Sequence, residues 1–372
     1  MQNSELFRFT SRCLSLNTQP VIVDKVRDAF ASGSVDIDHL IHFASNNFVL
    51  PAVWRRLEDA GLGELFPKEY SYHLKEVVQL NENRNNEILK QVAEISEVLF
   101  RAGIEPIYLK GTGNLLDGLY PSIADRMIGD IDFLVSLQDY EKSISIMQTI
   151  NYSSDVKLYP NELSWYHHPR MFKPKVPADV EIHNALTEFR YENNFKADKI
   201  IKDCISTNYL VGYVVPTTAN RIIHTFIHSQ LGNRGHRYYI PGLRDLYDAW
   251  LLSQQVNWRE VLEQIEEKEK ARVFFEYMEY LFCQEQDLSQ IKNKATLKYI
   301  RRHRWFMDHP RWHRLYIGSH KLYELLVIRY IKRIVRALFS KKDLLYIYRR
   351  LKDPAWYGKH FKRLRKQIFG KK

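Results

Sequence analysis

Two short stretches, residues 108–112 and 129–135, decide how this chain folds. The first reads Tyr-Leu-Lys-Gly-Thr and predicts a short buried strand that runs through a glycine-containing turn into a helix. The second reads Gly-Asp-Ile-Asp-Phe-Leu-Val and predicts another strand, in which Asp130 and Asp132 alternate with apolar residues. Strand side chains have a period of two, so both carboxylates point to one face of the sheet. Adjacent carboxylates repel each other unless a cation lies between them, and Mg²⁺ takes oxygen ligands of this kind together with substrate phosphates. The pattern therefore predicts a metal-dependent phosphate site.

A third stretch, residues 178–183, alternates polar and apolar side chains in the same way and predicts another strand. It places Glu181 and His183 on one face and their apolar neighbours on the other. Three converging carboxylates suit a site with two metal ions about 3.5–4 Å apart, one at the attacking oxygen and one at the phosphates. The alternative is an edge strand whose polar residues simply face solvent.

The turn after residue 109 is a second candidate for phosphate contact. Gly111, Thr112 and Gly113 are expected to begin a helix, whose free backbone N–H groups and positive dipole end attract anions. The order of residues is not that of a Walker loop, and glycine turns of this kind also occur without any ligand.

Taken together, these stretches resemble the polymerase-beta-type nucleotidyltransferase superfamily, and within it a bacterial branch of uncharacterised nucleotidyltransferase family proteins. The likeness covers residues 85–285 and departs from the superfamily at one place, because Lys110-Gly111-Thr112 stands where Gly-Ser or Gly-Gly-Ser is usual. The threonine hydroxyl can serve in place of a serine hydroxyl. The residues that carry the resemblance are Leu109 to Gly111, Tyr120, Pro121, Arg126, Asp130 to Val135, Val180 to His183, His224, His228, Leu243 to Asp248 and Val256 to Glu260.

The resemblance implies an α+β fold with a polymerase-beta-like nucleotidyltransferase core. Such a core is a short mixed sheet flanked by helices, here with further helical regions at both ends of the chain. Asp130, Asp132 and Glu181 would be catalytic and would bind two Mg²⁺ ions, with Mn²⁺ as a substitute. The residues that would hold an NTP such as ATP are Lys110, Gly111, Thr112 and Arg126.

In the reaction that the resemblance implies, an acceptor hydroxyl is deprotonated near the metals and attacks the α-phosphate in line. Pyrophosphate then leaves and an NMP group is transferred, with catalysis by positioning and charge stabilisation. The acceptor is expected to be a small molecule, a sugar or a peptide rather than a nucleic acid. The alternative is a catalytically weak, nucleotidyltransferase-like scaffold that docks on an anionic membrane or on RNA.

The role of Arg126 has two interpretations. A guanidinium fork matches phosphate oxygens, so Arg126 is expected either to contact phosphate or to form a salt bridge that orients Asp130 or Asp132.

Three further side chains, His183, His228 and Arg244, are predicted to support the site without binding the nucleotide. His224 and His228 are four residues apart and share a helix face, where core histidines are the favoured interpretation. The H-E-x-x-H order of a zinc protease is absent. Arg244 and Asp248 are expected to form an i,i+4 pair within one helix.

The composition is that of an ordinary globular chain of 372 residues, 45% apolar and 27% charged. Helical periodicity and charge divide it into an N-terminal helical region (1–82), a catalytic core (83–215), a helical domain that packs on the core (216–295) and a basic helical tail (296–372). Three scattered cysteines predict neither a disulfide partner nor a zinc site. With no signal peptide and no apolar run of membrane-spanning length, a cytoplasmic location is expected.

The tail carries most of the positive charge. Residues 298–372 hold 23 Lys and Arg against 4 Asp and Glu, a balance of +19, whereas the rest of the chain holds 32 against 40. Residues 316–339 place aliphatic side chains among basic ones at helical spacing, which predicts a basic amphipathic helix. We expect the tail to bind an anionic partner, either the inner face of a membrane or a nucleic acid. The alternative is that its apolar stripe packs on the body of the protein.

Overall fold

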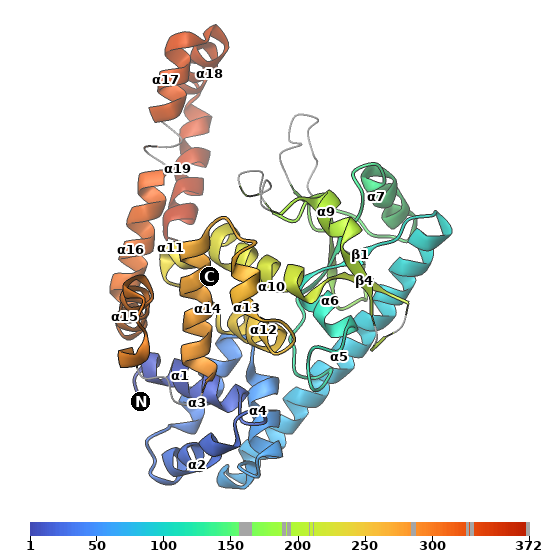
Figure 1. Cartoon of the computed structure of the whole chain (residues 1–372). Coiled ribbons are helices and arrows are strands. Elements are labelled where there is room, and N and C mark those ends of the chain that lie inside the picture. Colours follow the sequence, from blue (N-terminus) through green and yellow to red (C-terminus); the bar gives the residue numbers. More distant parts are fainter. Residues whose placement is uncertain are drawn as a thin grey trace. The chain divides into compact units, whose positions relative to one another are not determined.

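The computed structural model describes residues 1–155, 166–187, 191, 195–207, 209–210, 212–283, 288–324, 327 and 331–369. The chain forms two compact units, Met1–His303 and Arg304–Lys372, so that the first three expected regions lie together in one unit (Figure 1). Each unit is described by itself below.

The first unit begins with helices that lead into one very long helix. Four helices come first: α1 (Asn3–Leu14), α2 (Val23–Ala31), α3 (Ile37–Asn46) and α4 (Leu50–Asp59). The fifth, α5 (Lys68–Arg101), has 34 residues. Its expected start at residue 83, and with it the region boundary at 82, falls inside this helix.

The reason for that difference is two polar residues on the buried face of α5. Asn81 and Asn85 interrupt the apolar pattern, yet both are buried. The Asn81 amide donates to the carbonyl of Ala124 at 2.6 Å, and the Asn85 amide donates to the carbonyl of Arg126 at 2.8 Å. Buried amides with partners of this kind extend a helix core without apolar side chains.

The sheet that follows has five short strands in the order β3-β2-β1-β5-β4. It is mixed: β2 pairs parallel with β3 and antiparallel with β1, while β5 pairs parallel with β1 and antiparallel with β4. The expected mixed sheet flanked by helices is thereby confirmed. The strands are β1 (Ile107–Tyr108), β2 (Asp130–Leu134), β3 (Asp179–His183), β4 (Cys204–Ser206) and β5 (Val214–Pro216).

The two faces of the sheet differ in character. On one face the Tyr108 ring lies 6.1 Å from the Phe133 ring, and the Tyr108 hydroxyl bonds to Ser96 of α5 at 2.6 Å. Because side chains alternate along a strand, Asp130 and Asp132 project from the opposite face. The long helix thus packs on the apolar side and leaves the acidic side for ligands.

The helix after β1 is α6 (Lys110–Leu116). It begins at Lys110, before the glycines that were expected to begin it. Close packing explains Gly113, because a Cβ there would lie 2.4 Å from the carbonyl oxygen of Tyr108. A larger residue would push the helix away from the strand.

The remaining helices include those of the helical domain expected at 216–295, and the last of them runs past the end of the first unit. They are α7 (Tyr140–Thr149), α9 (Ala197–Lys202), α10 (Thr218–Phe226) with a π-helical continuation (Ile227–Gly232), α11 (Gly235–Tyr238), α12 (Leu243–Ser253), α13 (Trp258–Leu262), α14 (Lys268–Phe282) and α15 (Lys294–Asp308). Part of the β-like region expected at 155–173 lies outside the described residues. The part that is described adds single bridges to the sheet at Met171↔Val180 and Ser153↔Phe172.

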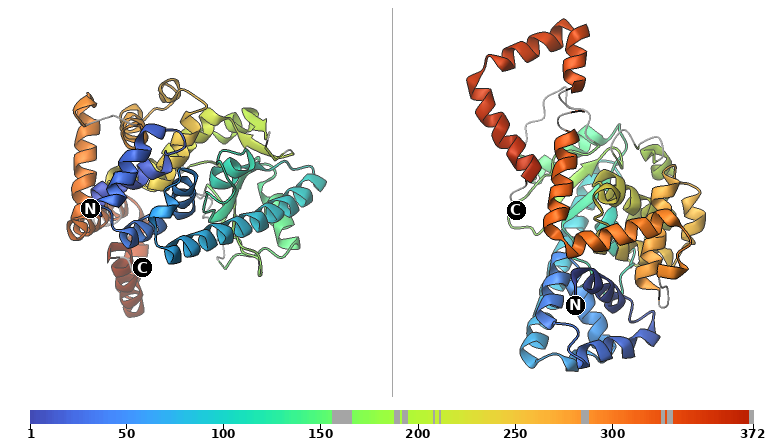
Figure 2. Two further views of the ribbon diagram at one scale, coloured as in Figure 1. Left: turned by 90° about the horizontal axis from the view of Figure 1, so that it is seen from below. Right: turned by 90° about the vertical axis from the view of Figure 1, so that its left-hand side faces the viewer.

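The second unit is helical, as the tail pattern predicts, and Figure 2 shows it in red and orange. The amphipathic helix expected at 316–339 corresponds to two helices, α16 and α17, with residues 325, 326 and 328–330 outside the described part. The helices pack in two pairs, α17 with α18 and α16 with α19. Their bounds are α16 (Pro310–Tyr323), α17 (Lys332–Phe339), α18 (Lys341–Leu351) and α19 (Pro354–Phe369). None of the helices in the described residues has the length and hydropathy needed to cross a membrane.

Candidate active site

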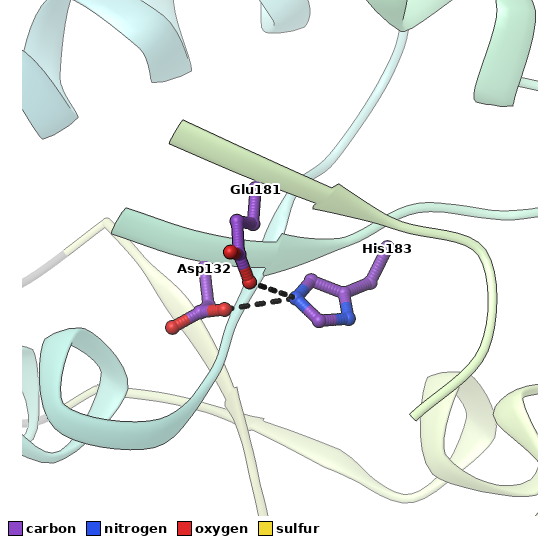
Figure 3. A group of neighbouring side chains, drawn as sticks. All are labelled: Asp132, Glu181 and His183. Carbon is purple, nitrogen blue, oxygen red and sulfur yellow. Dashed lines mark hydrogen bonds and ion pairs between the residues drawn. The ribbon is translucent and has the colours of Figure 1, made fainter. Parts of the chain in front are cut away.

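The register of β2 and β3 brings the predicted carboxylates together. Asp132 lies directly opposite Glu181 in the parallel ladder, so their side chains share one face. Figure 3 shows the side chains of Asp132, Glu181 and His183 pointing toward one another. Their ligand atoms all lie within 4.8 Å of one another. Among the described residues this is the group that has metal-ligand spacing.

A lysine lies between two of these carboxylates. The Lys110 ammonium is 2.7 Å from Asp132 and 3.8 Å from Glu181. Its backbone has φ +51°, the left-handed region that costs a non-glycine residue free energy and is most common at functional sites. Lys110 therefore delivers a positive charge into the acidic cluster.

An arginine neutralises the other side of the cluster. The Arg170 guanidinium is 2.8 Å from Asp130 and 3.1 Å from Glu181. The sequence analysis did not include Arg170 among the site residues. In the structure, the bridge between Met171 and Val180 places Arg170 beside Glu181.

The carboxylates differ in how firmly they hold their charge. Burial raises the pKa of Asp132, but Lys110 and a hydrogen bond from His183 outweigh it and hold that pKa well below its usual range. Burial and the charge of Asp132 raise the pKa of Glu181, and the same two causes raise the pKa of Asp130. Asp132 therefore stays ionised, whereas the ionisation of Asp130 and Glu181 depends on which cation lies close to them.

The carboxylate oxygens of Asp130, Asp132 and Glu181 are suited to bind divalent cations. Two side-chain cations already lie in it, Lys110 between Asp132 and Glu181 and Arg170 between Asp130 and Glu181. This arrangement, with Glu181 shared, is the charge pattern that two metal ions require. Oxygen ligands suit Mg²⁺ or Mn²⁺.

His183 fits a supporting role better than a ligand role. It is completely buried, and burial lowers its pKa to about 4, so the ring is neutral. Its Nε2 lies 2.8 Å from Asp132 and donates to it, while Nδ1 is buried without a hydrogen-bond partner among the described residues. Metal ligation through Nε2 would move the ring proton to that enclosed nitrogen, which is unfavourable.

These side chains border a cavity of about 310 Å³, large enough for a small ligand. Two residues predicted to support or bind the ligand, Thr112 and His183, are not part of its lining. Thr112 is fully buried and its hydroxyl donates to the carbonyl of Asp130 at 3.1 Å, so it stabilises β2 and is not directed at the cavity. The predicted residues that do line the cavity are Lys110, Gly111, Arg126, Asp130, Asp132, Glu181, His228 and Arg244.

The partner of Arg126 is neither of the two aspartates that were expected. Its Nε and a terminal nitrogen bond to both oxygens of Asp248, at 2.8 to 3.2 Å, and its other terminal nitrogen donates to the carbonyl of Met127. Tyr120 donates to Asp248 at 2.9 Å. Arg126 therefore ties the loop before β2 to α12, with its guanidinium already satisfied.

The expected pair of Arg244 and Asp248 is also not formed, because Asp248 points to Arg126. Arg244 instead lies 3.7 Å from Asp245 and 5.3 Å from the centre of the Phe48 ring, and it lines the cavity. Its positive charge also acts on Asp130, so Arg244 adds to the positive charge around the carboxylates.

His224 is a core histidine, as expected, and gives the fold a pH dependence. Burial, with a smaller contribution from Lys110, lowers the pKa of His224 to about 3, and its Nε2 donates to the carbonyl of Leu186 at 3.2 Å. In the unfolded chain the pKa is about 6.5, so the unfolded state binds a proton first as pH falls. Stability is therefore complete above pH 6.5 and decreases toward pH 3.

We expect His224 alone to lower the free energy of unfolding by about 2 kcal/mol between pH 7 and pH 5. Urea denaturation of the wild type and of His224→Gln, which keeps a donor but does not titrate, measures this. The variant is expected to lose about 2 kcal/mol less over the same interval. Equal losses in both proteins would show that His224 does not cause the dependence.

A sheet face with paired carboxylates, two side-chain cations and a polar cavity is typical of enzymes that handle phosphate-containing ligands. A family model described as "Uncharacterised nucleotidyltransferase" matches residues 33–283, and the chain belongs to that family. It is therefore a transferase enzyme, and the family implies a nucleotide substrate. No curated protein and no solved structure shows significant similarity to the chain. The resemblance to nucleotidyltransferases is confirmed, while the bacterial branch and the polymerase-beta superfamily stay predictions.

Proposed function

We propose that this protein transfers an NMP group from an NTP to an acceptor hydroxyl, with release of pyrophosphate and dependence on a divalent cation. The observation that carries the proposal is the placement of Asp132 opposite Glu181, with Lys110 between them. An acceptor that is a small molecule, a sugar or a peptide suits a cavity of about 310 Å³ better than a nucleic acid does.

The charged side chains of the cavity, and His183 behind them, have separate roles in this proposal. Asp130, Asp132 and Glu181 hold the metal ions, and His183 keeps Asp132 ionised and oriented through its hydrogen bond. Lys110 stabilises negative charge on the nucleotide phosphates once a divalent cation takes its place between the carboxylates. Arg244, which also lines the cavity, adds a second positive charge for the phosphates.

Two Mg²⁺ ions, or Mn²⁺ in their place, would supply charge neutralisation at the phosphates and would lower the pKa of the acceptor hydroxyl. Gly111 would add backbone contact to the phosphates. A Cβ there would come 3.0 Å from Ile128 and 3.4 Å from Arg126, so the glycine leaves room that another residue would fill. ATP is the first nucleotide to test.

Thermal shift with each of the four NTPs, with Mg²⁺ and with EDTA, tests this function together with an assay for pyrophosphate. We expect one NTP or more to raise the melting temperature by several degrees with Mg²⁺ and not with EDTA, because a bound ligand stabilises only the folded state. Incubation with candidate acceptors is expected to release pyrophosphate. Release of orthophosphate alone would indicate phosphoryl transfer, and no stabilisation by any NTP would contradict the proposal.

A second candidate function is a catalytically weak scaffold that docks on an anionic membrane or RNA through residues 298–372, in the cytoplasm or at the inner face of the membrane. The exposed basic surface of the second unit favours it. The intact carboxylate cluster favours the enzyme, since a scaffold gains nothing from three converging carboxylates that cost folding free energy.

A further inference from the structure

The second unit has almost no apolar core of its own. Among the residues of this unit whose burial the structure describes, Phe306 and Ala337 are the two that are buried. Large apolar side chains in the same helices are exposed instead, including Leu338 at 74% and Phe339 at 86%. An apolar surface of this extent indicates a binding surface, because exposed apolar area is unfavourable in water.

The exposed apolar residues gather on the helical hairpin formed by α17 and α18. Along α17 they follow the i, i+3, i+4, i+7 spacing of one helix face, and the small residue Ala337 lies on another side, where it is buried. In the α17–α18 hairpin the small side chain of Ala337 is therefore buried, and the aliphatic face is exposed to solvent. The outward residues are Ile331, Ile334, Val335, Leu338, Phe339, Leu344, Leu345, Tyr346, Tyr348 and Leu351.

Positive charge flanks this face. From Arg304 to Lys372 the sequence has 20 Lys and Arg against 4 Asp and Glu, a balance of +16. Arg336 is exposed beside the aliphatic residues of α17. Directly after α18, the Lys352 ammonium lies 4.4 Å from the centre of the Tyr348 ring, so a charged group and an aromatic ring lie at the same end of this helix. A helix with an aliphatic face and a basic flank binds in the plane of a lipid–water interface.

We infer that the α17–α18 hairpin docks the protein on the surface of an anionic lipid bilayer. The aliphatic face enters the boundary between headgroups and acyl chains, and the basic residues contact the lipid phosphates. This property is independent of nucleotidyl transfer, because the hairpin lies in a different unit from the carboxylate cluster.

Two other kinds of binding partner fit the surface of the α17–α18 hairpin less well. RNA binding uses basic grooves with stacking aromatic rings, and α18 does expose two rings, Tyr346 and Tyr348. The face of α17, however, consists of the aliphatic residues Ile331, Ile334, Val335 and Leu338, which have no partner on a nucleic acid. A second copy of the chain would bring together two units that each carry +16, and like charges at an interface cost free energy. A bilayer with anionic headgroups complements both the apolar face and the charge.

Vesicle co-sedimentation with the full chain tests the inference. We expect the wild type to bind vesicles of phosphatidylcholine with 30% phosphatidylglycerol at least tenfold more tightly than vesicles of phosphatidylcholine alone, with weaker binding at high salt. Leu338→Gln/Phe339→Gln is expected to weaken binding to anionic vesicles by about tenfold or more, because two apolar side chains leave the interface.

The matched control is Tyr72→Gln/Leu80→Gln, which replaces two similarly exposed apolar side chains on α5, 75% and 61% exposed. This control is expected to bind vesicles as the wild type does. Both variants should keep the melting temperature and the nucleotide stabilisation of the wild type, so failure here is distinct from failure of the proposed transfer reaction.

Three outcomes would overturn the inference. Wild-type protein that does not sediment with anionic vesicles has no lipid-binding surface. Tighter binding to a single-stranded RNA of 30 nucleotides than to vesicles, unchanged in Leu338→Gln/Phe339→Gln, would assign the basic unit to nucleic acid. A wild-type dimer in light scattering that the same variant converts to a monomer would assign the apolar face to self-association.

Discussion

An Asp132→Asn variant is expected to lose Mg²⁺-dependent nucleotide binding and to release pyrophosphate about 10³-fold more slowly than the wild type. Asp132 accepts from Lys110 at 2.7 Å and from His183 at 2.8 Å, and it has the lowest pKa of the three carboxyl groups. An amide of the same shape removes the charge that holds a cation there. Calorimetric titration with Mn²⁺ and the pyrophosphate assay measure both effects.

Two further variants make this test specific. Asp198→Asn, at an exposed position of α9, removes one carboxylate elsewhere and is expected to behave as the wild type. Lys110→Met removes the internal cation, so Mn²⁺ affinity without nucleotide should rise while NTP affinity falls. If Asp132→Asn bound Mn²⁺ as tightly as the wild type, Asp132 would not be a metal ligand.

Replacing Arg126 by methionine is expected to lower the free energy of unfolding by about 3–5 kcal/mol, because it leaves the Asp248 carboxylate buried without its charged partner. Only 7% of Arg126 and 4% of Asp248 are exposed, so solvent cannot compensate. Urea denaturation followed by circular dichroism measures the loss. The expected effect is on folding, and nucleotide affinity of the folded fraction should change little.

The double variant Arg126→Met/Asp248→Asn distinguishes a structural pair from a phosphate contact. Asparagine carries no charge and still accepts the hydrogen bond from Tyr120, so the double variant should recover most of the loss. An Arg126→Met protein that kept its stability but no longer bound NTP would instead support the phosphate contact that the sequence suggests.

The sequence was sufficient to predict the centre of the site. Alternation around Asp130 and around Glu181 located β2 and β3 to within one or two residues. Alternation also settled which side chains share a face, because a strand has only two faces. The parallel register that places Asp132 opposite Glu181 then followed from the fold.

Contacts between distant segments were not predictable. Arg126 and Asp248 are 122 positions apart, and nothing local to either residue identifies the other. Arg170 reaches Asp130 across 40 positions. Thr112 looked like a phosphate ligand because its sequence position matched, but whether a hydroxyl faces a cavity or a neighbouring carbonyl depends on how the helix packs.

The unbroken length of α5 has a consequence for how the enzyme moves. At 1.5 Å per residue its 34 residues form a rod about 51 Å long, which joins the N-terminal helices to the sheet without a hinge. Asn81 and Asn85 on this rod also hold the loop that leads into β2. We therefore expect the N-terminal helices, α5 and the loop that leads into β2 to move together as one rigid body. Any opening of the cavity during turnover then comes from the other segments that line it.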